Sequence, residues 1–264
     1  MHASFGPGGA LERALPGFER RAEQAALADA VERALAGGEH LVAEAGTGTG
    51  KSLAYLIPAL ESGRRVIVAT ATKALQEQLL AKDVPTAARA LGREVRVAVL
   101  KGRQNYLCRK QLQTFGPMLL RDGRDARAFD ALLPWIDSTQ TGDRAEAPLE
   151  PSDVLWAELA VGGDRCTGRR CPFFAGCYAE AARARAGEAE LVIANHALYF
   201  ADVAAGGGVL PEHDAVVFDE AHRLEETVAT WLGGRVSRAG LRRLATDVER
   251  ACREAGKPFP ARAL

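Results

Sequence analysis

The sequence predicts an α/β fold in which a parallel sheet is covered by helices on both faces. Short apolar strands alternate with helix-length segments through the first hundred residues, and the alternation returns between residues 189 and 222. A glycine-rich loop joins the first of these strands to a helix, which is a second mark of such folds. With 264 residues, of which 47% are hydrophobic, the chain can bury a substantial core in one or two domains.

The elements before residue 104 follow from periodicity and from glycine. The opening ten residues, which include three glycines, are predicted to be flexible. A helix is predicted from Ala22, since apolar residues recur on one face, and Gly37–Gly38 end it. Strands are predicted at residues 40–45, 64–72 and 94–102, with helices from Lys51 and over residues 73–83.

An insertion interrupts this pattern after Lys101. No clear strand is visible between Asn105 and about Gly187, where helical pieces flank an acidic loop that contains prolines. Strands are predicted again at residues 189–195 and 214–222. The segment from about Arg235 to Leu264 is helix-like, with apolar residues on one face at Leu241, Leu244 and Val248.

The stretch AGTGTGKS, residues 45–52, is typical of a loop that binds nucleotide phosphates. Its glycines let backbone N–H groups converge on phosphate oxygens, and the helix that follows directs its positive end at them. Lys51 is expected to reach the β- and γ-phosphates, and Ser52 to ligate Mg²⁺. Ala45 stands where the usual pattern has its first glycine. The predicted site comprises Ala45, Gly46, Thr47, Gly48, Thr49, Gly50, Lys51 and Ser52.

An acidic pair closes the apolar run AVVFDEAH at residues 215–222. Asp219, at the end of a buried strand, can face the Mg²⁺ beside Ser52, and Glu220 can orient and deprotonate the attacking water. An acidic turn after a strand is common in α/β proteins. The pair therefore takes its meaning from its combination with the phosphate loop.

Three of the five cysteines, Cys166, Cys171 and Cys177, are clustered in the short segment CTGRRCPFFAGC. In a reducing compartment such clusters favour metal binding or redox chemistry over disulfides. Cys108 is the candidate for a fourth ligand, whereas Cys252 is predicted to be a small buried residue on an apolar helical face. The spacing lacks the Cys-x₂-Cys pairs common in zinc sites, but thiolate chemistry leaves zinc and a four-iron cluster equally open.

Charge and hydropathy narrow the class of protein only slightly. The 34 basic and 34 acidic residues give no net charge that would indicate nucleic-acid binding. Basic side chains gather within residues 101–110 and 164–185, where a solvated surface and a nucleic-acid contact are both open. Neither a signal peptide nor an apolar run of membrane-spanning length is visible, so we expect a cytoplasmic protein without a membrane partner.

Six stretches, in this order along the chain, resemble the iron–sulfur branch of the superfamily 2 DNA helicases, and within it the DinG type related to XPD. They are FERRAEQ (18–24), AGTGTGKS (45–52), ATATKALQEQLL (69–80), KGRQNYLC (101–108), VIANHALYFAD (192–202) and DEAH (219–222). The resemblance runs from about Phe18 to Glu226. Because several independent motifs occur in the order that the family shows, the resemblance is specific.

This resemblance implies a role for each candidate residue. It implies that Gln24 recognises the adenine base, with Arg21 in a supporting role. It implies that Lys51, Asp219 and Glu220 are catalytic and that Ser52 and Asp219 bind Mg²⁺. It assigns a 4Fe–4S cluster to Cys108, Cys166, Cys171 and Cys177, beside which Phe173 and Phe174 could stack on bases or pack around the cluster. It places DNA contacts at Thr72, Lys101, Arg103, Asn105, Tyr106, Asn195 and His196.

The resemblance also implies an organisation and an activity. A RecA-like first motor domain would comprise residues 1–104 and 188–234, with an iron–sulfur module at 105–187 and the start of a helical arch at 235–264. The implied activity is ATP-dependent 5′-to-3′ translocation on single-stranded DNA, with unwinding of tailed or forked duplexes, by a monomer that acts in DNA repair.

The alternatives are a P-loop ATPase that assembles iron–sulfur clusters and a non-catalytic, zinc-stabilised DNA-binding module. After the DEAH residues none of the family's later motifs is visible. We therefore expect this stretch of chain to bind Mg²⁺–ATP but to turn it over very slowly by itself, without the arginine of a second motor domain.

Overall fold

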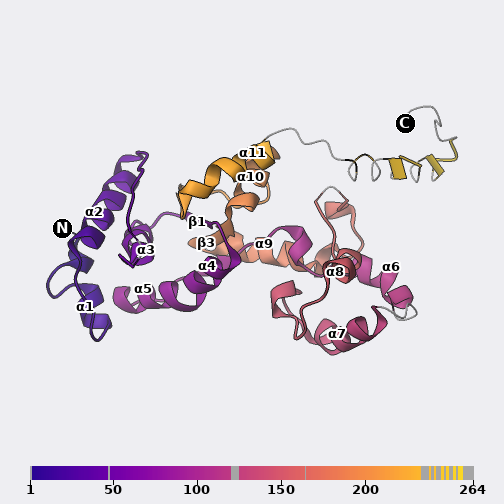
Figure 1. The fold of residues 1–264 in the computed structure, drawn as a ribbon, viewed down its shortest axis with the longest axis horizontal. Helices are drawn as coiled ribbons and strands as arrows, with labels where there is room; N and C mark the ends of the chain where they lie inside the picture. Colours follow the sequence, from indigo (N-terminus) through magenta and orange to yellow (C-terminus); the bar gives the residue numbers. More distant parts are fainter. Residues whose placement is uncertain are drawn as a thin grey trace.

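A parallel sheet lies at the centre of the molecule, as the sequence predicts, and it has four of the five predicted strands (Figure 1). The computed structural model describes residues 2–46, 48–119, 125–163 and 165–232, and scattered residues between 238 and 257. Within these residues the strand order is β2-β3-β1-β4, and the pairings are parallel. The strands are β1 (Val66–Thr70), β2 (Val97–Val99), β3 (Leu191–Asn195) and β4 (Ala215–Phe218).

Helices make up most of the remaining described chain. Helix α2 begins at the predicted Ala22, and Gly38 ends it in the left-handed conformation, with φ of 67°, that glycine adopts without steric cost. The predicted helix at 73–83 continues through a short π-helical turn, η2 (Leu79–Asp83), into α5. The helices are α1 (Ala10–Ala14), α2 (Ala22–Gly37), α3 (Lys51–Glu61), α4 (Lys73–Gln78), α5 (Val84–Leu91), α6 (Arg109–Leu119), α7 (Ala126–Ser138), α8 (Asp153–Leu159), α9 (Tyr178–Glu188), α10 (His196–Ala204) and α11 (Leu224–Leu232).

Each face of the sheet carries its own apolar cluster, because successive strand residues point to opposite faces. Val66 and Val68 pack with α2, α3 and α5, whereas Ile67 packs in the cluster of α7, α8 and α9. All five residues of β1 are buried, as expected for a parallel strand covered on both sides. In Figure 1, α1, α2 and α3 lie at the end of the molecule that carries the amino terminus, and α6, α7 and α8 lie toward the opposite end.

The strand predicted at residues 40–45 is not formed, and this prediction is wrong. The segment is irregular and pairs with none of the described strands, and Val42 is 98% exposed. The sheet ends at β4, which pairs only with β1 among the described strands. An apolar run becomes a strand only where a neighbour completes its backbone hydrogen bonds, and residues 40–45 have no such neighbour within the described chain.

The opening residues are ordered, contrary to the prediction of a flexible start. A 3₁₀ turn, η1 (Ala3–Phe5), and helix α1 place Phe5 and Leu11 in the cluster of α2, α3 and α5, where they are 3% and 0% exposed. The Ser4 hydroxyl donates a hydrogen bond to Glu61 at the end of α3, at 2.9 Å. The prediction relied on glycine content and was wrong. The free energy gained by burying the two apolar side chains exceeds the conformational entropy lost when the neighbouring residues are fixed.

The insertion between β2 and β3 is helical, as predicted. Its described residues form helices and turns but no strand, apart from an isolated antiparallel bridge between Tyr106 and Asp143. Phe129, Leu132 and Leu155 are at most 1% exposed and belong to the same apolar cluster as the second face of the sheet. The insertion therefore shares a core with the sheet.

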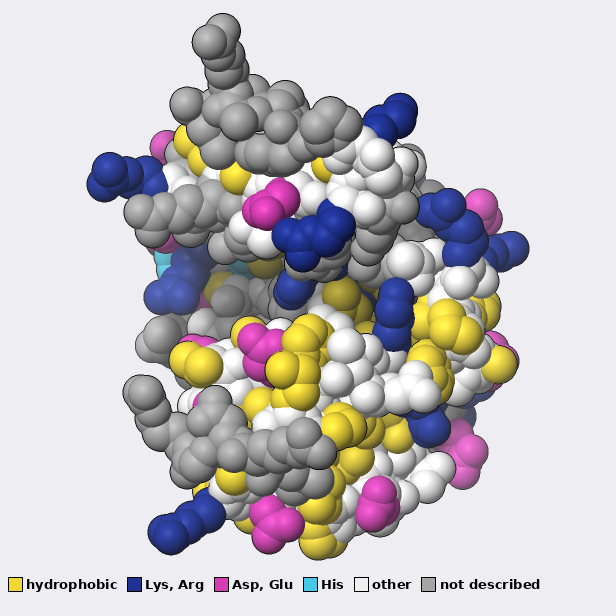
Figure 2. All heavy atoms as spheres, turned by 90° about the vertical axis from the view of Figure 1, so that its right-hand side faces the viewer, with side chains coloured by type: hydrophobic (Ala, Val, Ile, Leu, Met, Phe, Trp, Pro, Cys, Tyr) yellow, Lys and Arg dark blue, Asp and Glu magenta, His cyan; other side chains and the backbone are white. Residues whose placement is uncertain are grey.

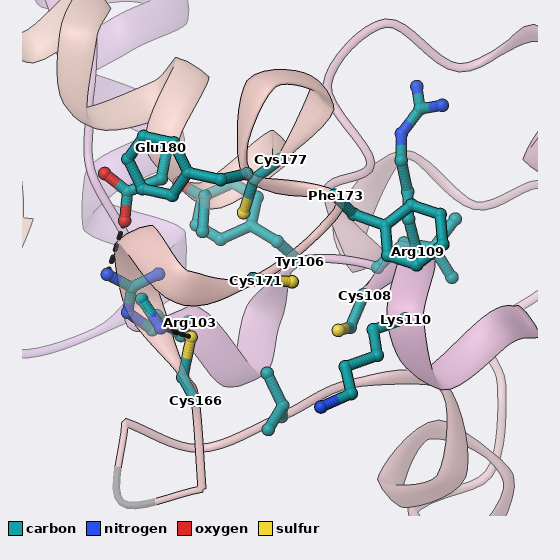
Figure 3. Close-up of a pocket in the computed structure, with 15 residues that line it drawn as sticks. Arg103, Tyr106, Cys108, Arg109, Lys110, Cys166, Cys171, Phe173, Cys177 and Glu180 are labelled. Carbon is teal, nitrogen blue, oxygen red and sulfur yellow. Dashed lines mark hydrogen bonds and ion pairs between the residues drawn. The ribbon is translucent and has the colours of Figure 1, made fainter. Parts of the chain in front are cut away.

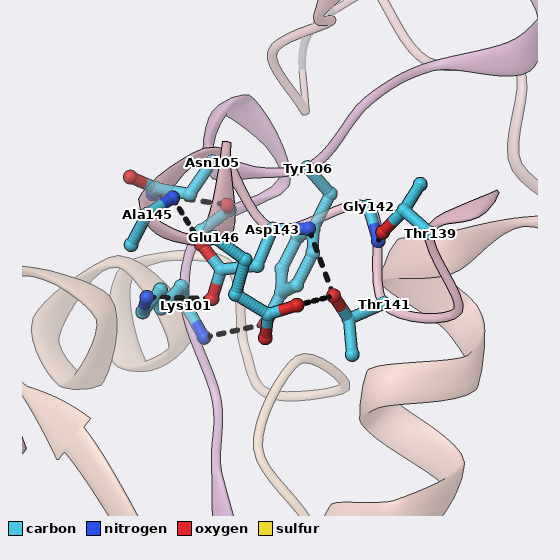
Figure 4. A network of polar contacts seen from close by, with 10 residues as sticks. Lys101, Asn105, Tyr106, Thr139, Thr141, Gly142, Asp143, Ala145 and Glu146 are labelled. Carbon is cyan, nitrogen blue, oxygen red and sulfur yellow. Dashed lines mark hydrogen bonds and ion pairs between the residues drawn. The ribbon is translucent and has the colours of Figure 1, made fainter. Parts of the chain in front are cut away.

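A polar network joins the insertion to the sheet where the chain leaves β2 (Figure 4). Lys101 Nζ lies 2.5 Å from Asp143 Oδ2, and these side chains are only 17% and 14% exposed. The Tyr106 hydroxyl accepts a hydrogen bond from the Lys101 backbone N–H at 3.2 Å. Asp143 also accepts from the Ala145 N–H at 3.0 Å. Two segments of the insertion, one at its start and one after α7, are thereby held to Lys101 just after the end of β2.

The predicted arch segment at 235–264 lies largely outside the described residues, and Leu244 is among those outside. Leu241 and Val248 are described as helical, and they are 50% and 37% exposed. Among the described residues, no helix combines the length and the apolar character that crossing a bilayer requires.

Candidate functional site

The phosphate loop connects the irregular segment at 40–45 to the start of α3, with Thr47 outside the described residues. Gly48 and Gly50 have φ of 80° and 77°, the left-handed region that favours glycine. At Gly50 a Cβ atom would also lie 2.2 Å from the side-chain nitrogen of Gln24. Helix α3 begins directly after it, at Lys51. The loop thus has the backbone conformation and the helix amino terminus that phosphate binding requires.

Gln24 and Arg21 hold the loop itself. Gln24 is 4% exposed, and its Nε2 donates to the Gly50 carbonyl at 2.9 Å. The Arg21 guanidinium donates to the Gly48 carbonyl. The structure thus brings both residues to the phosphate loop from the start of α2, while the reading of adenine that the resemblance implies stays a prediction.

The acidic pair lies opposite the loop, at the end of β4. Lys51 Nζ is 3.4 Å from Glu220 Oε1, and both side chains are about 30% exposed. Glu220 has a φ of 57°, and among the described residues it is the only one other than glycine with a left-handed backbone. Such strain costs on the order of 1–3 kcal/mol and concentrates at functional sites. The predicted catalytic residues Lys51, Asp219 and Glu220 therefore converge.

Two buried residues contact Asp219, and sequence reasoning missed the role of both. The Tyr55 hydroxyl donates to Asp219 Oδ2 at 3.1 Å, and burial together with the Asp219 charge raises the pKa of Tyr55 far above its usual value. His196 Nε2 lies 2.9 Å from the Asp219 carbonyl oxygen and 3.1 Å from that of Ala69. Helical spacing gave a signal for Tyr55, which is one turn after Lys51 in α3.

The residues predicted to contact DNA each have a partner within the chain. Thr72 and Asn195 cap the amino ends of α4 and α10, and Thr70 pairs in register with Asn195, so these caps lie at the same edge of the sheet. Arg103 pairs with Glu180, and Lys101 pairs with Asp143. The Asn105 side chain donates to the Gly102 carbonyl at 3.1 Å.

Burial separates two of these predicted contacts from the rest. Tyr106 and His196 are 4% and 2% exposed, so their side chains are less accessible than those of the other five residues. Burial raises the pKa of Tyr106 to about 12, and burial lowers that of His196, against the opposing hydrogen bonds to Asp219 and Ala69. DNA contact by all seven residues stays a prediction.

The four predicted ligands, Cys108, Cys166, Cys171 and Cys177, line one pocket. Their sulfur atoms turn toward a common space, although Cys108 is 58 residues or more from the others in sequence (Figure 3). Cys108 precedes α6 and Cys177 precedes α9, while the other two lie in irregular segments before and after the 3₁₀ turn η5 (Gly168–Arg170). All five cysteines are free thiols, and Cys252 is half-buried rather than fully buried.

The cysteines surround a space and do not converge on one point. Within the described residues, no three histidine, cysteine or carboxylate side chains form a group that could hold a single metal ion. A zinc ion bound at about 2.3 Å by each sulfur would need such convergence. Burial raises the pKa of the Cys108 thiol, and the nearby Cys177 and Cys171 add to this effect against hydrogen bonds from the backbone.

Basic and aromatic side chains surround the cysteines. Arg103, Arg109 and Lys110 line the pocket together with Phe173 and Phe174. Tyr178 is buried, with the Arg109 guanidinium 4.7 Å from its ring centroid. On the face that carries the insertion, Figure 2 shows Lys and Arg side chains around a hollow and a band of hydrophobic side chains below it. Phe173 and Phe174 thus face the cysteine pocket.

Comparison with known proteins agrees with the geometry of the site. The DEAD/DEAH box helicase family matches residues 24–121. The ATP-dependent DNA helicase YoaA of Escherichia coli is 38% identical over 96% of this chain and 41% of its own length. The ATP-dependent helicase DinG of Mycobacterium tuberculosis is 40% identical over 90% of the chain and 39% of its own length. The 3′-5′ exonuclease DinG of Bacillus subtilis is 37% identical over 86% of the chain and 25% of its own length.

The chain carries a DEAD/DEAH box helicase domain, with the phosphate loop and the DEAH residues facing each other at one edge of a parallel sheet. Within that class, its resemblance to the DinG-type helicases is confirmed by DinG and YoaA relatives that are similar over most of the chain. The chain spans about two fifths of the length of these two relatives.

Proposed function

We propose that this chain is the ATP-binding motor segment of a DinG-type DNA helicase, which couples ATP hydrolysis to 5′-to-3′ movement along single-stranded DNA. The proposal rests on one observation. Lys51 Nζ lies 3.4 Å from Glu220 Oε1, beside a glycine-rich loop that leads into the amino terminus of α3. DinG and YoaA relatives, named ATP-dependent helicases, support the same conclusion.

The residues present fit a magnesium–nucleotide complex. Ser52 and Asp219 supply the hydroxyl and carboxylate oxygens that Mg²⁺ prefers, and the Tyr55 hydroxyl donates a hydrogen bond to Asp219. When bound, the metal neutralises charge that develops on the transferred phosphoryl group. Lys51 would exchange Glu220 for phosphate oxygens, which frees the Glu220 carboxylate to orient a water and accept its proton.

The four cysteines fit an iron–sulfur cluster, which we propose as the resident cofactor of residues 105–187. Thiolates are the ligands of such clusters, and sulfurs arranged around a space suit a cofactor with several metal atoms. Arg103, Arg109 and Lys110 would offset the negative charge of the thiolates. Protein purified without oxygen should contain about four iron and four sulfide per chain, whereas stoichiometric zinc without sulfide would contradict the proposal.

We propose single-stranded DNA as the partner that the chain binds. The proposed substrate for unwinding is duplex DNA with a single-stranded tail or a fork. Two capping residues, Thr72 and Asn195, lie at the edge of the sheet that also carries Asp219, so DNA bound there would lie close to the nucleotide. Binding through phosphates should weaken as salt is added, because counterions are released. We further propose a monomeric, cytoplasmic protein that acts in DNA repair.

Nucleotide and DNA titrations test the motor proposal together. A fluorescent ATP analogue should bind in the presence of Mg²⁺, and Lys51→Ala should lower its affinity at least about tenfold, since a charge-assisted contact to phosphate contributes about 1.5–3 kcal/mol. Lys82→Ala, in the π-helical turn η2, is the control and should bind normally. Equal binding by wild type and Lys51→Ala would contradict the proposal.

A further inference from the structure

We propose that Tyr55 is a positioning residue of the magnesium site, which orients the Asp219 carboxylate for metal binding. This inference rests on the proposed function. Tyr55 is 5% exposed and lies in α3, one turn after the residues that begin the helix. Its hydroxyl donates to Asp219 Oδ2 at 3.1 Å. A buried phenol on the helix that begins with Lys51 and Ser52 therefore holds the carboxylate expected to bind the metal.

Asp219 is held from three further directions, which leaves Tyr55 as its side-chain donor among the described contacts. The Glu220 backbone N–H donates to Asp219 Oδ1 at 3.0 Å. The Asp219 N–H donates to the Ala69 carbonyl at 2.9 Å. The Asp219 carbonyl oxygen lies 2.9 Å from His196 Nε2. The backbone at the end of β4 is thereby fixed by protein contacts.

The carboxylate keeps room for a metal despite these contacts. An ionised carboxylate offers about four lone-pair sites, and Tyr55 and the Glu220 N–H occupy two of them. The remaining sites can face a cation beside Ser52. A hydrogen bond from a buried donor fixes the rotation of the carboxylate, in the same way that outer partners orient metal ligands in other proteins. Removing the Tyr55 hydroxyl should therefore weaken metal binding without removing a ligand.

The opposing view makes Tyr55 an ordinary core residue, since its ring lies in the apolar cluster of α2, α3 and α5. The two views differ in one measurable way. A core role predicts that Tyr55→Phe changes thermal stability and nothing specific to magnesium. A positioning role predicts a change in the Mg²⁺ dependence of nucleotide binding, while nucleotide affinity without metal stays as in wild type.

The test titrates Mg²⁺ at a fixed concentration of a fluorescent ATP analogue, with the 264-residue chain and its variants. Tyr55→Phe should raise the Mg²⁺ concentration for half-maximal binding about tenfold, as substitutions of outer partners do at metal sites. Analogue binding in EDTA should not change. Tyr199→Phe, which removes a hydroxyl in α10 that contacts His213, is the matched control and should behave as wild type.

A double-mutant cycle keeps the inference testable even if the substitution also affects folding. In an Asp219→Ala background, Tyr55→Phe should produce no further shift in Mg²⁺ dependence, because the carboxylate that it positions is gone. An unchanged Mg²⁺ dependence in the single variant, an equal loss of binding in EDTA, or a full shift in the Asp219→Ala background would each overturn the positioning role alone. A wild-type chain whose nucleotide binding ignores Mg²⁺ would overturn the proposed function as well.

Discussion

The nucleotide site and the cysteine segment are built in opposite ways. The nucleotide site rests on the ends of β1 and β4 and on α3, whose residues from Ala54 to Leu60 are all buried. The described residues of 161–177 contain only two 3₁₀ turns, η5 (Gly168–Arg170) and η6 (Phe174–Gly176), and none of them is buried.

This difference indicates where the stability of each region comes from. Burial of apolar surface in the elements that carry the nucleotide site stabilises them before any ligand binds. The free energy gained is roughly 25 cal/mol per Å² of apolar surface buried. The cysteine segment buries little, so bonds from its thiols to a cofactor would supply most of its folding free energy. The account therefore expects substitutions to affect the two regions separately.

The largest expected effect is the loss of a cysteine ligand. Cys171→Ser should lower the iron content from about four per chain to well below one, and protease cleavage within 161–177 should become much faster. Iron analysis and limited proteolysis of anaerobically purified protein check this. Cys252→Ser is the control and should retain full iron content. A Cys171→Ser protein with wild-type iron content would show that the segment is held in another way.

The next largest effect is expected from a substitution that disrupts the nucleotide site without affecting the cysteine segment. Gly50→Ala places a Cβ atom on a residue with φ of 77°, a conformation that costs an L-residue about 1–2 kcal/mol. The added Cβ would also clash with the side chain of Gln24. Nucleotide affinity should fall at least about tenfold, measured by titration, with iron content unchanged. Gly63→Ala is the matched control, since its φ is 68° but no atom lies within 4 Å of an added Cβ. Equal affinities for the two variants would contradict the described loop.

The joint between the two regions should give an intermediate effect. Lys101→Met breaks the partly buried pair with Asp143 and should destabilise the chain by about 1.5–3 kcal/mol in urea unfolding. Arg253→Met, which breaks an exposed pair with Glu249, should cost less than about 1 kcal/mol.

Comparison with Asp143→Asn then decides between two roles for Lys101. If Lys101 mainly joins the insertion to the sheet, both variants should lose similar stability and little affinity for single-stranded DNA. A loss of DNA affinity in Lys101→Met alone would instead support the predicted DNA contact.

The smallest effect concerns Glu190, just before β3. Burial alone would raise its pKa, but hydrogen bonds from Arg93 and from the Arg96 N–H lower it below the usual value. Because the pKa is lower in the folded state, this carboxylate stabilises the fold above its unfolded pKa of about 4.3, and the stabilisation is lost as pH falls through the folded pKa. Glu190→Gln should cost at most about 1 kcal/mol at pH 7, since solvent screens the pair. Urea unfolding should show wild type and variant converging in acid, and a constant difference would contradict this assignment.

The sequence predicted the features that depend on local pattern. Most helices and strands and the position of the phosphate loop follow from periodicity and motif spacing. That Asp219 and Glu220 lie near the phosphate loop was predicted from the combination of two motifs, whereas the contact between Lys51 and Glu220 was not predicted. Two failures depended on distant partners. Residues 40–45 needed a neighbouring strand, and the opening residues found burial beside α3 that no local pattern shows. Helical spacing from Lys51 placed Tyr55 on the side of α3 that carries the site, but its partner Asp219 is 164 residues away, so the contact between them was missed.

The most direct test of the account is hydrogen–deuterium exchange in anaerobically purified protein, before and after iron is removed. We expect amide exchange in residues 161–177 to become much faster when iron is lost, because the proposed cofactor would supply the stability of that segment. Exchange in residues 54–60 should stay the same, because burial in α3 protects those amides. Unchanged exchange in 161–177, or equal acceleration in both segments, would contradict the claim that the two regions are stabilised in different ways.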